Sequence, residues 1–210
     1  MSPPLEFIAI AESRHLIIPL GKVILQKAAA FVKKLTDRGY GSYPIAINVS
    51  AMQLLDETFV DAIQTIAAEG GIRTEQLEIE LTESVFSSNF EFLSKQMKKI
   101  HALGIRIAID DFGTGFSSLN RLQGLVVDTL KLDKQFVDKI MDPKDSGISS
   151  DIISMAHHLG KQIIAEGVET KEQHRKLLDM GCDFMQGYLF SRPVGEEEAI
   201  ALLSQQRDGS

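Results

Sequence analysis

Hydrophobic residues gather in short runs that are separated by longer segments with one apolar face. Between the runs lie helical patterns, and segment 90–104 (FEFLSKQMKKIHALG) ends in the glycine expected just past a helix. A long helical segment, about 16–36, precedes the first run. Six runs are predicted to be strands: 45–50, 77–82, 105–110, 129–133, 161–166 and 182–190. Apolar strands separated by helices indicate parallel β/α units, either in a doubly wound sheet or in a barrel.

Polar residues stand at or near the ends of these predicted strands. They are Asn48, Glu80, Asp110, Lys131, Glu166 and Gln186. In a parallel barrel the carboxyl ends of all strands meet at one rim, whereas an open sheet would spread them along an edge. The pattern therefore favours an α/β fold of the (β/α)8 TIM-like barrel class. A complete barrel has eight strands and about 250 residues. The six runs predict that its first one or two strands would precede residue 1.

Composition narrows the kind of protein. At 210 residues and 44% hydrophobic, the chain is expected to form a single domain, residues 1–210, with a sizeable core. One cysteine, Cys182, excludes an internal disulfide and favours the reducing cytoplasm. Apolar stretches such as 16–25 (LIIPLGKVIL) are interrupted by Pro, Gly or Lys, so no membrane segment is expected. The net charge of −7 argues against a nucleic-acid polymer as partner, but leaves a phosphate-bearing substrate open.

Segment 106–115 (RIAIDDFGTG) ends a strand on two adjacent carboxylates, Asp110 and Asp111. Because like charges resist burial together, this arrangement requires either a turn exposed to solvent or a bound cation. Taken with Asn48 and Glu80, Asp110 completes an oxygen donor set that suits Mg²⁺ or Mn²⁺. Asp111 could serve a second ion, as in the paired-metal sites that cleave phosphoesters.

Three other polar residues have competing interpretations. Lys131 could orient a water or a phosphate beside such a cluster, or it could be a strand-end lysine in solvent. His157 and His158 are consecutive on a predicted helix. Their side chains therefore point about 100° apart, and we interpret them as surface or packing residues.

The ordered motifs of the chain resemble the EAL family of bacterial cyclic di-GMP phosphodiesterases. The series is FIAIAE, INVSAMQL, EIELTES, IAIDDFGTGFSSL, VDTLKLDKQFV, IIAEGVET and QGYLFSRPV, and it extends from about Pro4 to Val194. The resemblance implies a modified β/α barrel. It also implies hydrolysis of one phosphodiester bond of cyclic di-GMP to linear pGpG with Mg²⁺ or Mn²⁺.

Nine positions match functional residues of that family. The resemblance implies metal ligands at Asn48, Glu80 and Asp110, a second-metal and water-assisting aspartate at Asp111, a lysine near the attacking water at Lys131, a base or metal-site glutamate at Glu166, a substrate-pocket residue at Gln186, a glutamate that anchors the loop after the aspartates at Glu83, and a supporting glutamate at Glu169.

The resemblance also sets expectations beyond these residues. The strand that gives the family its name, with its glutamate and a following arginine, is expected before the segment that opens this chain. The glycine-containing loop 111–118 and the helices after it are expected to contribute to a homodimer. Two alternatives to a cytoplasmic hydrolase stay open: a non-catalytic dinucleotide receptor or protein-interaction module, and a different Mg²⁺-dependent barrel enzyme.

Overall fold

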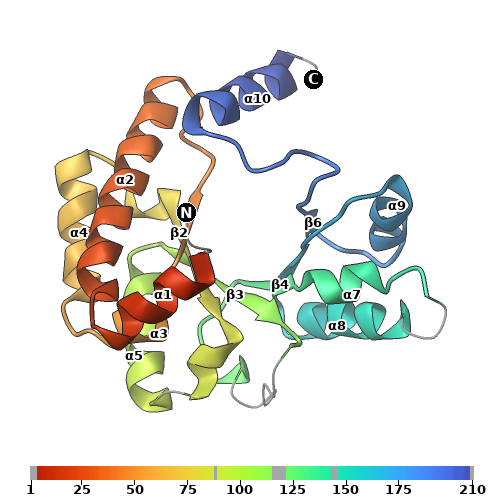
Figure 1. Ribbon diagram of the computed structural model, residues 1–210, viewed down its shortest axis with the longest axis horizontal. Helices are drawn as coiled ribbons and strands as arrows, with labels where there is room; N and C mark the ends of the chain where they lie inside the picture. Colours follow the sequence, from red (N-terminus) through yellow and green to blue (C-terminus); the bar gives the residue numbers. More distant parts are fainter. Residues whose placement is uncertain (1–3, 88, 115–121, 143–145, 209–210) are drawn as a thin grey trace. The chain divides into compact units, whose positions relative to one another are not determined.

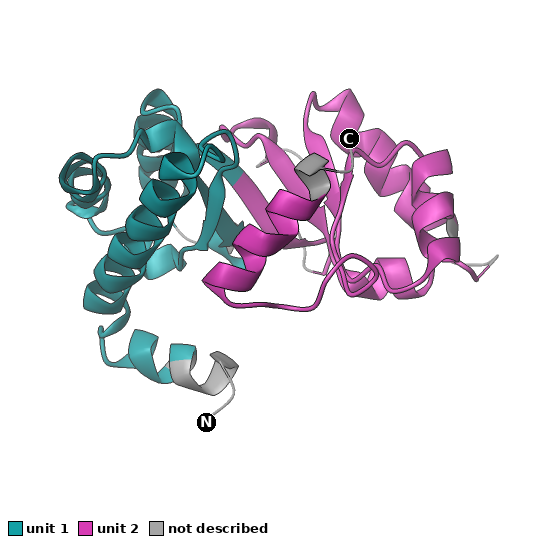
Figure 2. Cartoon of the chain, turned by 90° about the horizontal axis from the view of Figure 1, so that it is seen from above, with its two compact units in different colours: residues 1–107 teal, residues 108–210 magenta. Residues whose placement is uncertain are grey.

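The computed structural model describes residues 4–87, 89–114, 122–142 and 146–208 (Figure 1). The chain divides into two compact units, residues 1–107 and residues 108–210, which Figure 2 colours teal and magenta. That residues 1–210 form a single domain stays a prediction. Loop 111–118 is described only as far as residue 114.

Unit 1 is an α/β assembly with a long, partly buried helix. Helix α2 buries one face at spacings of three and four residues, including Leu25, Ala29 and Val32, as an amphipathic helix does against a core. Its elements are α1 (Pro4–Ser13), α2 (Ile17–Asp37), β1 (Ile45–Asn48), α3 (Ala51–Leu54), α4 (Phe59–Gly70), the 3₁₀ turn η1 (Thr74–Gln76), β2 (Leu77–Thr82), the 3₁₀ turn η2 (Glu83–Ser87) and α5 (Phe90–Ala102).

Helix α5 confirms the helix predicted over 90–104. The Asn89 side chain accepts a hydrogen bond from the Phe92 amide at 3.3 Å, which satisfies a free donor of the first turn. After Ala102, Gly104 has a φ of 78° in the left-handed region that glycine adopts easily. The side chain of Asn89 thus explains where helix α5 begins, and Gly104 explains where it ends.

The two strands of unit 1 are parallel. In the β1–β2 pair, Asn48 lies opposite Glu80. Strand β2 is buried along its length up to its last residue, Thr82, as expected for a parallel strand covered on both faces. Its Glu78 carboxylate lies 2.9 Å from the guanidinium of Arg106.

Unit 2 continues the alternation of strands and helices. Strand β3 (Arg106–Phe112) begins in the last residues of unit 1 and pairs in parallel with β4, which pairs with β5, which pairs with β6. The remaining elements are β4 (Thr129–Leu132), α7 (Lys134–Asp138), α8 (Ser146–His158), β5 (Gln162–Ala165), α9 (Lys171–Asp179), β6 (Phe184–Met185) and α10 (Glu196–Asp208). All four residues of β4 are buried, which places this strand in the core of the unit.

The last predicted strand, 182–190, was too long. Strand β6 covers only Phe184–Met185, because the backbone beyond it turns around Val168. The Val168 amide donates to the Gln186 carbonyl at 3.0 Å, and the Leu189 amide donates to the Val168 carbonyl at 3.0 Å. Gly187 lies so close that a Cβ there would come within 2.2 Å of the Val168 oxygen. This contact ends the strand just before Gln186.

No helix among the described residues is both long enough and apolar enough for a membrane crossing. The other strand predictions are confirmed within about two residues of their ends.

Candidate active site

A β-bulge at the end of β3 orients the two adjacent aspartates. Ile109 is in register with Leu130 and Phe112 with Leu132, so Asp110 and Asp111 together lie opposite the single residue Lys131. In a regular strand, consecutive side chains would point to opposite faces. Here Asp111 has a φ of 55°, and its amide donates to the Asp110 Oδ1 at 3.0 Å. The bulge therefore allows both carboxylates to take part in one cluster.

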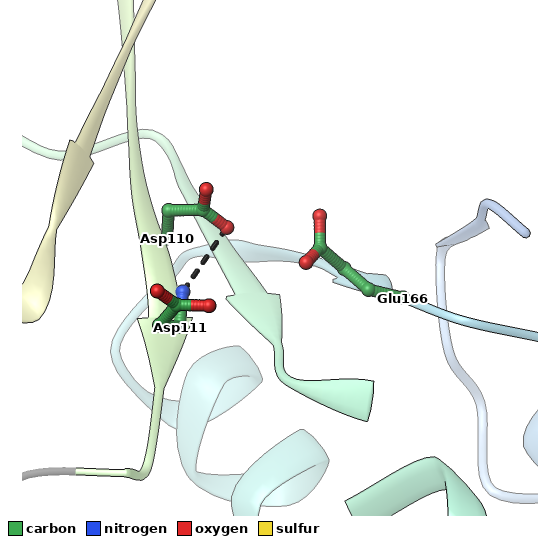
Figure 3. Close-up of side chains that lie close together, drawn as sticks. All are labelled: Asp110, Asp111 and Glu166. Atoms are coloured by element: carbon green, nitrogen blue, oxygen red, sulfur yellow. Dashed lines mark hydrogen bonds between the residues drawn. The ribbon is translucent and has the colours of Figure 1, made fainter. Parts of the chain in front are cut away.

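Four side chains of unit 2 form this acidic cluster: Asp110, Asp111, Lys131 and Glu166. The Lys131 ammonium lies 3.1 Å from Asp110 Oδ1 and 2.8 Å from Glu166 Oε1, with only 5% of its side chain exposed. The three acidic residues each place a carboxylate oxygen within 4.8 Å of the others. Figure 3 shows Asp110 and Glu166 pointing toward one another from β3 and from the residue after β5. Two carboxylates thus contact one ammonium, and the carboxylate of Asp111 lies beside them.

The environment of Asp111 raises the pKa of its carboxyl group. Partial burial is the largest cause, followed by the charges of Asp110 and Asp133, and the nearby Lys131 opposes the shift. Asp133 lies against Asp111 and also accepts the Gln135 amide at 2.9 Å, which caps α7. Negative charge has therefore accumulated here beyond what Lys131 offsets.

An open cavity of about 560 Å³ adjoins this cluster at Glu166. The predicted residues Glu166, Glu169 and Gln186 all line it. Gln186 Nε2 donates to Glu166 Oε1 at 2.5 Å, and the Lys134 ammonium lies 3.1 Å from Glu169 Oε1. The wall also includes Tyr188 and Arg192, whose guanidinium carbon is 4.5 Å from the tyrosine ring centroid.

The other predicted ligands lie in unit 1. Asn48 ends β1 with an exposed side chain and is the register partner of the buried Glu80 on β2. Glu83 is buried at the start of η2. Their assignment as metal ligands and as a loop anchor stays a prediction.

The donor chemistry of the acidic cluster fits a hard divalent cation. Asp110, Asp111 and Glu166 offer oxygen atoms alone, the donor type that Mg²⁺ and Mn²⁺ prefer. A divalent cation would also offset the repulsion that raises the pKa of Asp111. The cluster can therefore hold a metal ion beside a cavity of substrate size.

Three residues of this region were missed from the sequence. Asp133 follows Lys131 by two positions, which is the signal that could have identified it, since the ends of parallel strands gather polar side chains. Tyr188 and Arg192 carry no such signal, because their place in the cavity follows from the turn around Val168.

His157 was interpreted as a surface or packing residue, and its contacts agree with that. Its Nε2 is 3.0 Å from Asp183 Oδ2, which also accepts the Ile163 amide at 2.9 Å. The histidine thus links α8 to the residue just before β6 and has no place in the acidic cluster.

Comparison with known proteins gives consistent matches. The family described as EAL domain matches residues 1–193. Signaling protein YkoW of Bacillus subtilis is 40% identical over 98% of this chain and 26% of its own length. Cyclic di-GMP phosphodiesterase PdeR of Escherichia coli is 36% identical over 91% of this chain and 29% of its own length. The solved PaMucR phosphodiesterase in complex with c-di-GMP has a TM-score of 0.88 at 34% identity, covering 93% of this chain and 80% of its own.

These similarities confirm the predicted fold class, a β/α barrel of the EAL type. The chain spans about a quarter to a third of the length of the curated relatives named here.

Proposed function

Because the chain belongs to the EAL domain family, we propose that it hydrolyses one phosphodiester bond of cyclic di-GMP to linear pGpG in bacterial second-messenger signalling, with Mg²⁺ or Mn²⁺ as cofactor. The observation that carries the proposal is the acidic cluster of Asp110, Asp111, Lys131 and Glu166 beside the 560 Å³ cavity. The similarity to PdeR and to the MucR complex with c-di-GMP supports the choice of substrate.

Charge explains why the cofactor is needed. A cyclic dinucleotide carries two phosphate charges, and three carboxylates would repel it. Asp110, Asp111 and Glu166 would hold a divalent cation, which would supply positive charge toward the phosphate and make a bound water more acidic. From the family resemblance alone, we also expect Asn48 and Glu80 to be metal ligands.

The protein groups then have distinct tasks. Lys131 is held between Asp110 and Glu166, so its ammonium is positioned to orient the attacking water or to stabilise charge on the phosphate. Glu166 receives hydrogen bonds from Lys131 and Gln186, which fix the direction of its carboxylate beside Asp110 and Asp111. Asp111 lies beside Asp110 and Glu166, where we expect it to assist the water, as the family resemblance implies.

The cavity residues fit the remaining parts of the substrate. Tyr188 and Arg192 offer an aromatic face and a planar cation, and both can stack on a base. Gln186 and Glu169 add polar groups to the same wall, where we place them as substrate-binding and supporting residues. In the reaction the water oxygen bonds to phosphorus, the bond from phosphorus to O3′ breaks, and O3′ receives a proton. The product is linear pGpG with a 5′-phosphate.

The test is the release of pGpG by the purified chain with Mn²⁺, with Mg²⁺ and with excess chelator. We expect turnover with either metal ion and none with chelator. Lys131→Ala and Glu166→Gln should each lower kcat by about a hundredfold or more, with a much smaller change in dinucleotide affinity. Lys98→Ala, an exposed lysine on α5, is the control and should keep full turnover.

The alternatives predict different results. Tight binding of cyclic di-GMP without turnover under any metal condition would favour the receptor function. Turnover of other phosphodiesters in preference to cyclic di-GMP would favour a different Mg²⁺-dependent enzyme.

Two further expectations belong to this proposal. We assign the chain to the cytoplasm, and we expect a homodimer, as the family resemblance implies. Light scattering of the purified chain, with and without cyclic di-GMP, measures the oligomeric state directly.

A further inference from the structure

A second concave surface of unit 2 lies between α9 and the segment that follows β6. It measures about 450 Å³ and is lined by Lys171, His174, Arg175, Leu178, Leu189 and Phe190, which we call the α9 groove. None of these six residues lines the cavity at Glu166. Elements α9 and β6 are labelled in Figure 1.

The fold positions both walls of the α9 groove. Four of its residues, at positions 171, 174, 175 and 178, recur at the spacing of one helix face, while Leu177 is buried on another. Thr170 and Gln173 form a capping box that fixes the start of α9. On the opposite wall, the Leu189 amide bonds to Val168 and the His174 ring meets the Phe190 ring edge-on at 5.8 Å.

One half of the groove carries the positive charges of Lys171 and Arg175. Among the described residues, no carboxylate pairs with Lys171 or with Arg175. Lys171 lies in the first turn of α9, where the helix dipole disfavours a positive charge, so its presence does not stabilise the helix. The acidic residues of α9, Glu172 and Asp179, do not line the groove. This local positive charge contrasts with the net charge of −7 of the whole chain.

The other half of the groove is apolar and open to water. Leu178 is 55% exposed and Phe190 is 53% exposed, and Leu189 belongs to the same lining. Apolar side chains that lie together next to unpaired cations form an amphipathic surface. Its complement is a ligand that carries carboxylates beside an aliphatic or aromatic group.

We propose that the α9 groove is a docking site for an acidic, amphipathic segment of a partner polypeptide. Carboxylates of the segment pair with Lys171 and Arg175, and one large apolar side chain packs between Leu178, Leu189 and Phe190. The aliphatic residues in the lining, Leu178 and Leu189, favour an apolar protein side chain over a nucleotide base, which stacks on flat aromatic or guanidinium faces. This proposal does not depend on the proposed hydrolysis.

The test uses three fluorescein-labelled hexapeptides with the purified chain. The probe is Glu-Glu-Leu-Phe-Glu-Glu, and the comparison peptides are Glu-Glu-Ser-Ser-Glu-Glu and Lys-Lys-Leu-Phe-Lys-Lys. Fluorescence anisotropy at low salt measures their affinities. We expect the probe to bind more tightly than either comparison peptide, because only the probe matches both halves of the groove.

Variants locate the binding site. Arg175→Glu should weaken binding of the probe by at least about tenfold, since it turns attraction into repulsion. Phe190→Ser should lower the affinity for the probe but leave the affinity for Glu-Glu-Ser-Ser-Glu-Glu unchanged, since that peptide has no apolar side chain. The control is Lys98→Glu, which also replaces a positive charge by a negative one. Lys98 is an exposed lysine on α5 that lines a different groove, so this change should leave the affinity for the probe within about twofold. Circular dichroism melts verify that each variant is folded.

Three outcomes would overturn the proposal. Equal affinity for both acidic peptides would mean non-specific charge attraction. Equal losses in Arg175→Glu and Lys98→Glu would place the binding elsewhere. Binding of GMP that Arg175→Glu abolishes, with no binding of the hexapeptide probe, would identify the groove as a nucleotide site.

Discussion

Two sites in this chain bring carboxylates against cations, and they differ in charge balance. In unit 1 the Glu78 carboxylate, 8% exposed, meets the half-exposed guanidinium of Arg106 at 2.9 Å. In unit 2 the acidic cluster brings Asp110 and Glu166 against the Lys131 ammonium, with a third carboxylate, Asp111, beside them. The first arrangement matches one negative charge with one positive charge. The second leaves an excess of negative charge in a partly buried place.

The difference distinguishes a structural ion pair from a site that suits a ligand. A matched pair needs nothing further to offset its charges, and Glu78 lies two residues before Glu80, away from the end of the strand. An excess of carboxylates costs free energy that a bound cation can recover at neutral pH and that protonation removes at low pH. Mutations at the two sites should therefore respond differently to divalent metal.

Lys131→Met should have the largest effect of the changes considered. It leaves Asp110 and Glu166, each 16% exposed, without the ammonium between them, and we expect a loss of about 3 kcal/mol in the free energy of unfolding. Added Mn²⁺ should restore much of this loss by replacing the missing charge. Urea unfolding with and without Mn²⁺ measures both effects.

The control for this change is Lys33→Met, which removes an exposed lysine paired with Asp37. It should cost less than about 1 kcal/mol, as surface pairs generally do. If Lys131→Met unfolds at the same urea concentration as the wild type, repulsion between the carboxylates of the acidic cluster does not lower the stability of the folded chain.

Asp110→Asn should remove the stabilisation that divalent metal gives. A ligand present at one hundred times its Kd stabilises a folded protein by about 2.7 kcal/mol, and we expect a gain of this order for the wild type in saturating Mn²⁺. The variant keeps the size of the side chain but loses an anionic ligand, so its gain should fall below about 0.5 kcal/mol at the same metal concentration. Thermal unfolding followed by circular dichroism measures the gain, and an equal gain in both proteins would contradict the assignment of Asp110.

Arg106→Met should destabilise the chain without affecting its chemistry. It removes the guanidinium that pairs with the buried Glu78, and we expect the free energy of unfolding to fall by about 2 kcal/mol. This loss is smaller than for a fully buried ion pair because Arg106 is half exposed. The double variant Glu78→Gln with Arg106→Met should recover part of the loss, since it no longer buries that charge. Mn²⁺ should stabilise this variant as much as the wild type, and turnover per folded molecule should stay unchanged. If Mn²⁺ stabilised the Arg106→Met variant less than the wild type, the distinction between the two sites would be wrong.

The sequence predicted the four residues that the structure brings together in the acidic cluster, but not how the backbone presents them. The hydrophobic runs predicted the observed bounds of β2 and came within two residues of those of β3. Such runs can be recognised in the sequence because buried strands are made of apolar residues. The bulge that turns Asp111 depends on the register between β3 and β4, which no local pattern encodes. The end of β6 likewise depends on the close approach of Gly187 to Val168, which lies nineteen residues earlier in the chain.

Asp111→Asn should have the smallest effect on stability, and it should be favourable. Burial and the charges of Asp110 and Asp133 raise the pKa of Asp111, so its ionised form destabilises the folded chain at neutral pH. Asparagine removes that charge and also adopts the left-handed backbone of this position readily. We expect a gain of roughly 0.5 kcal/mol at pH 7 without metal, kept small by solvent screening.

The pH dependence of this gain identifies its cause. Because the pKa is higher in the folded chain than in the unfolded one, the wild type regains stability as the pH falls through the folded pKa. Below the ordinary carboxyl value of 3.8, Asp111 is protonated in both states and no penalty remains. The advantage of Asp111→Asn should therefore be present at pH 7 and shrink toward pH 4, leaving only the backbone contribution. Urea unfolding of both proteins across this range measures it, and an advantage that grows on acidification would show that Asp111 is stabilised as an anion.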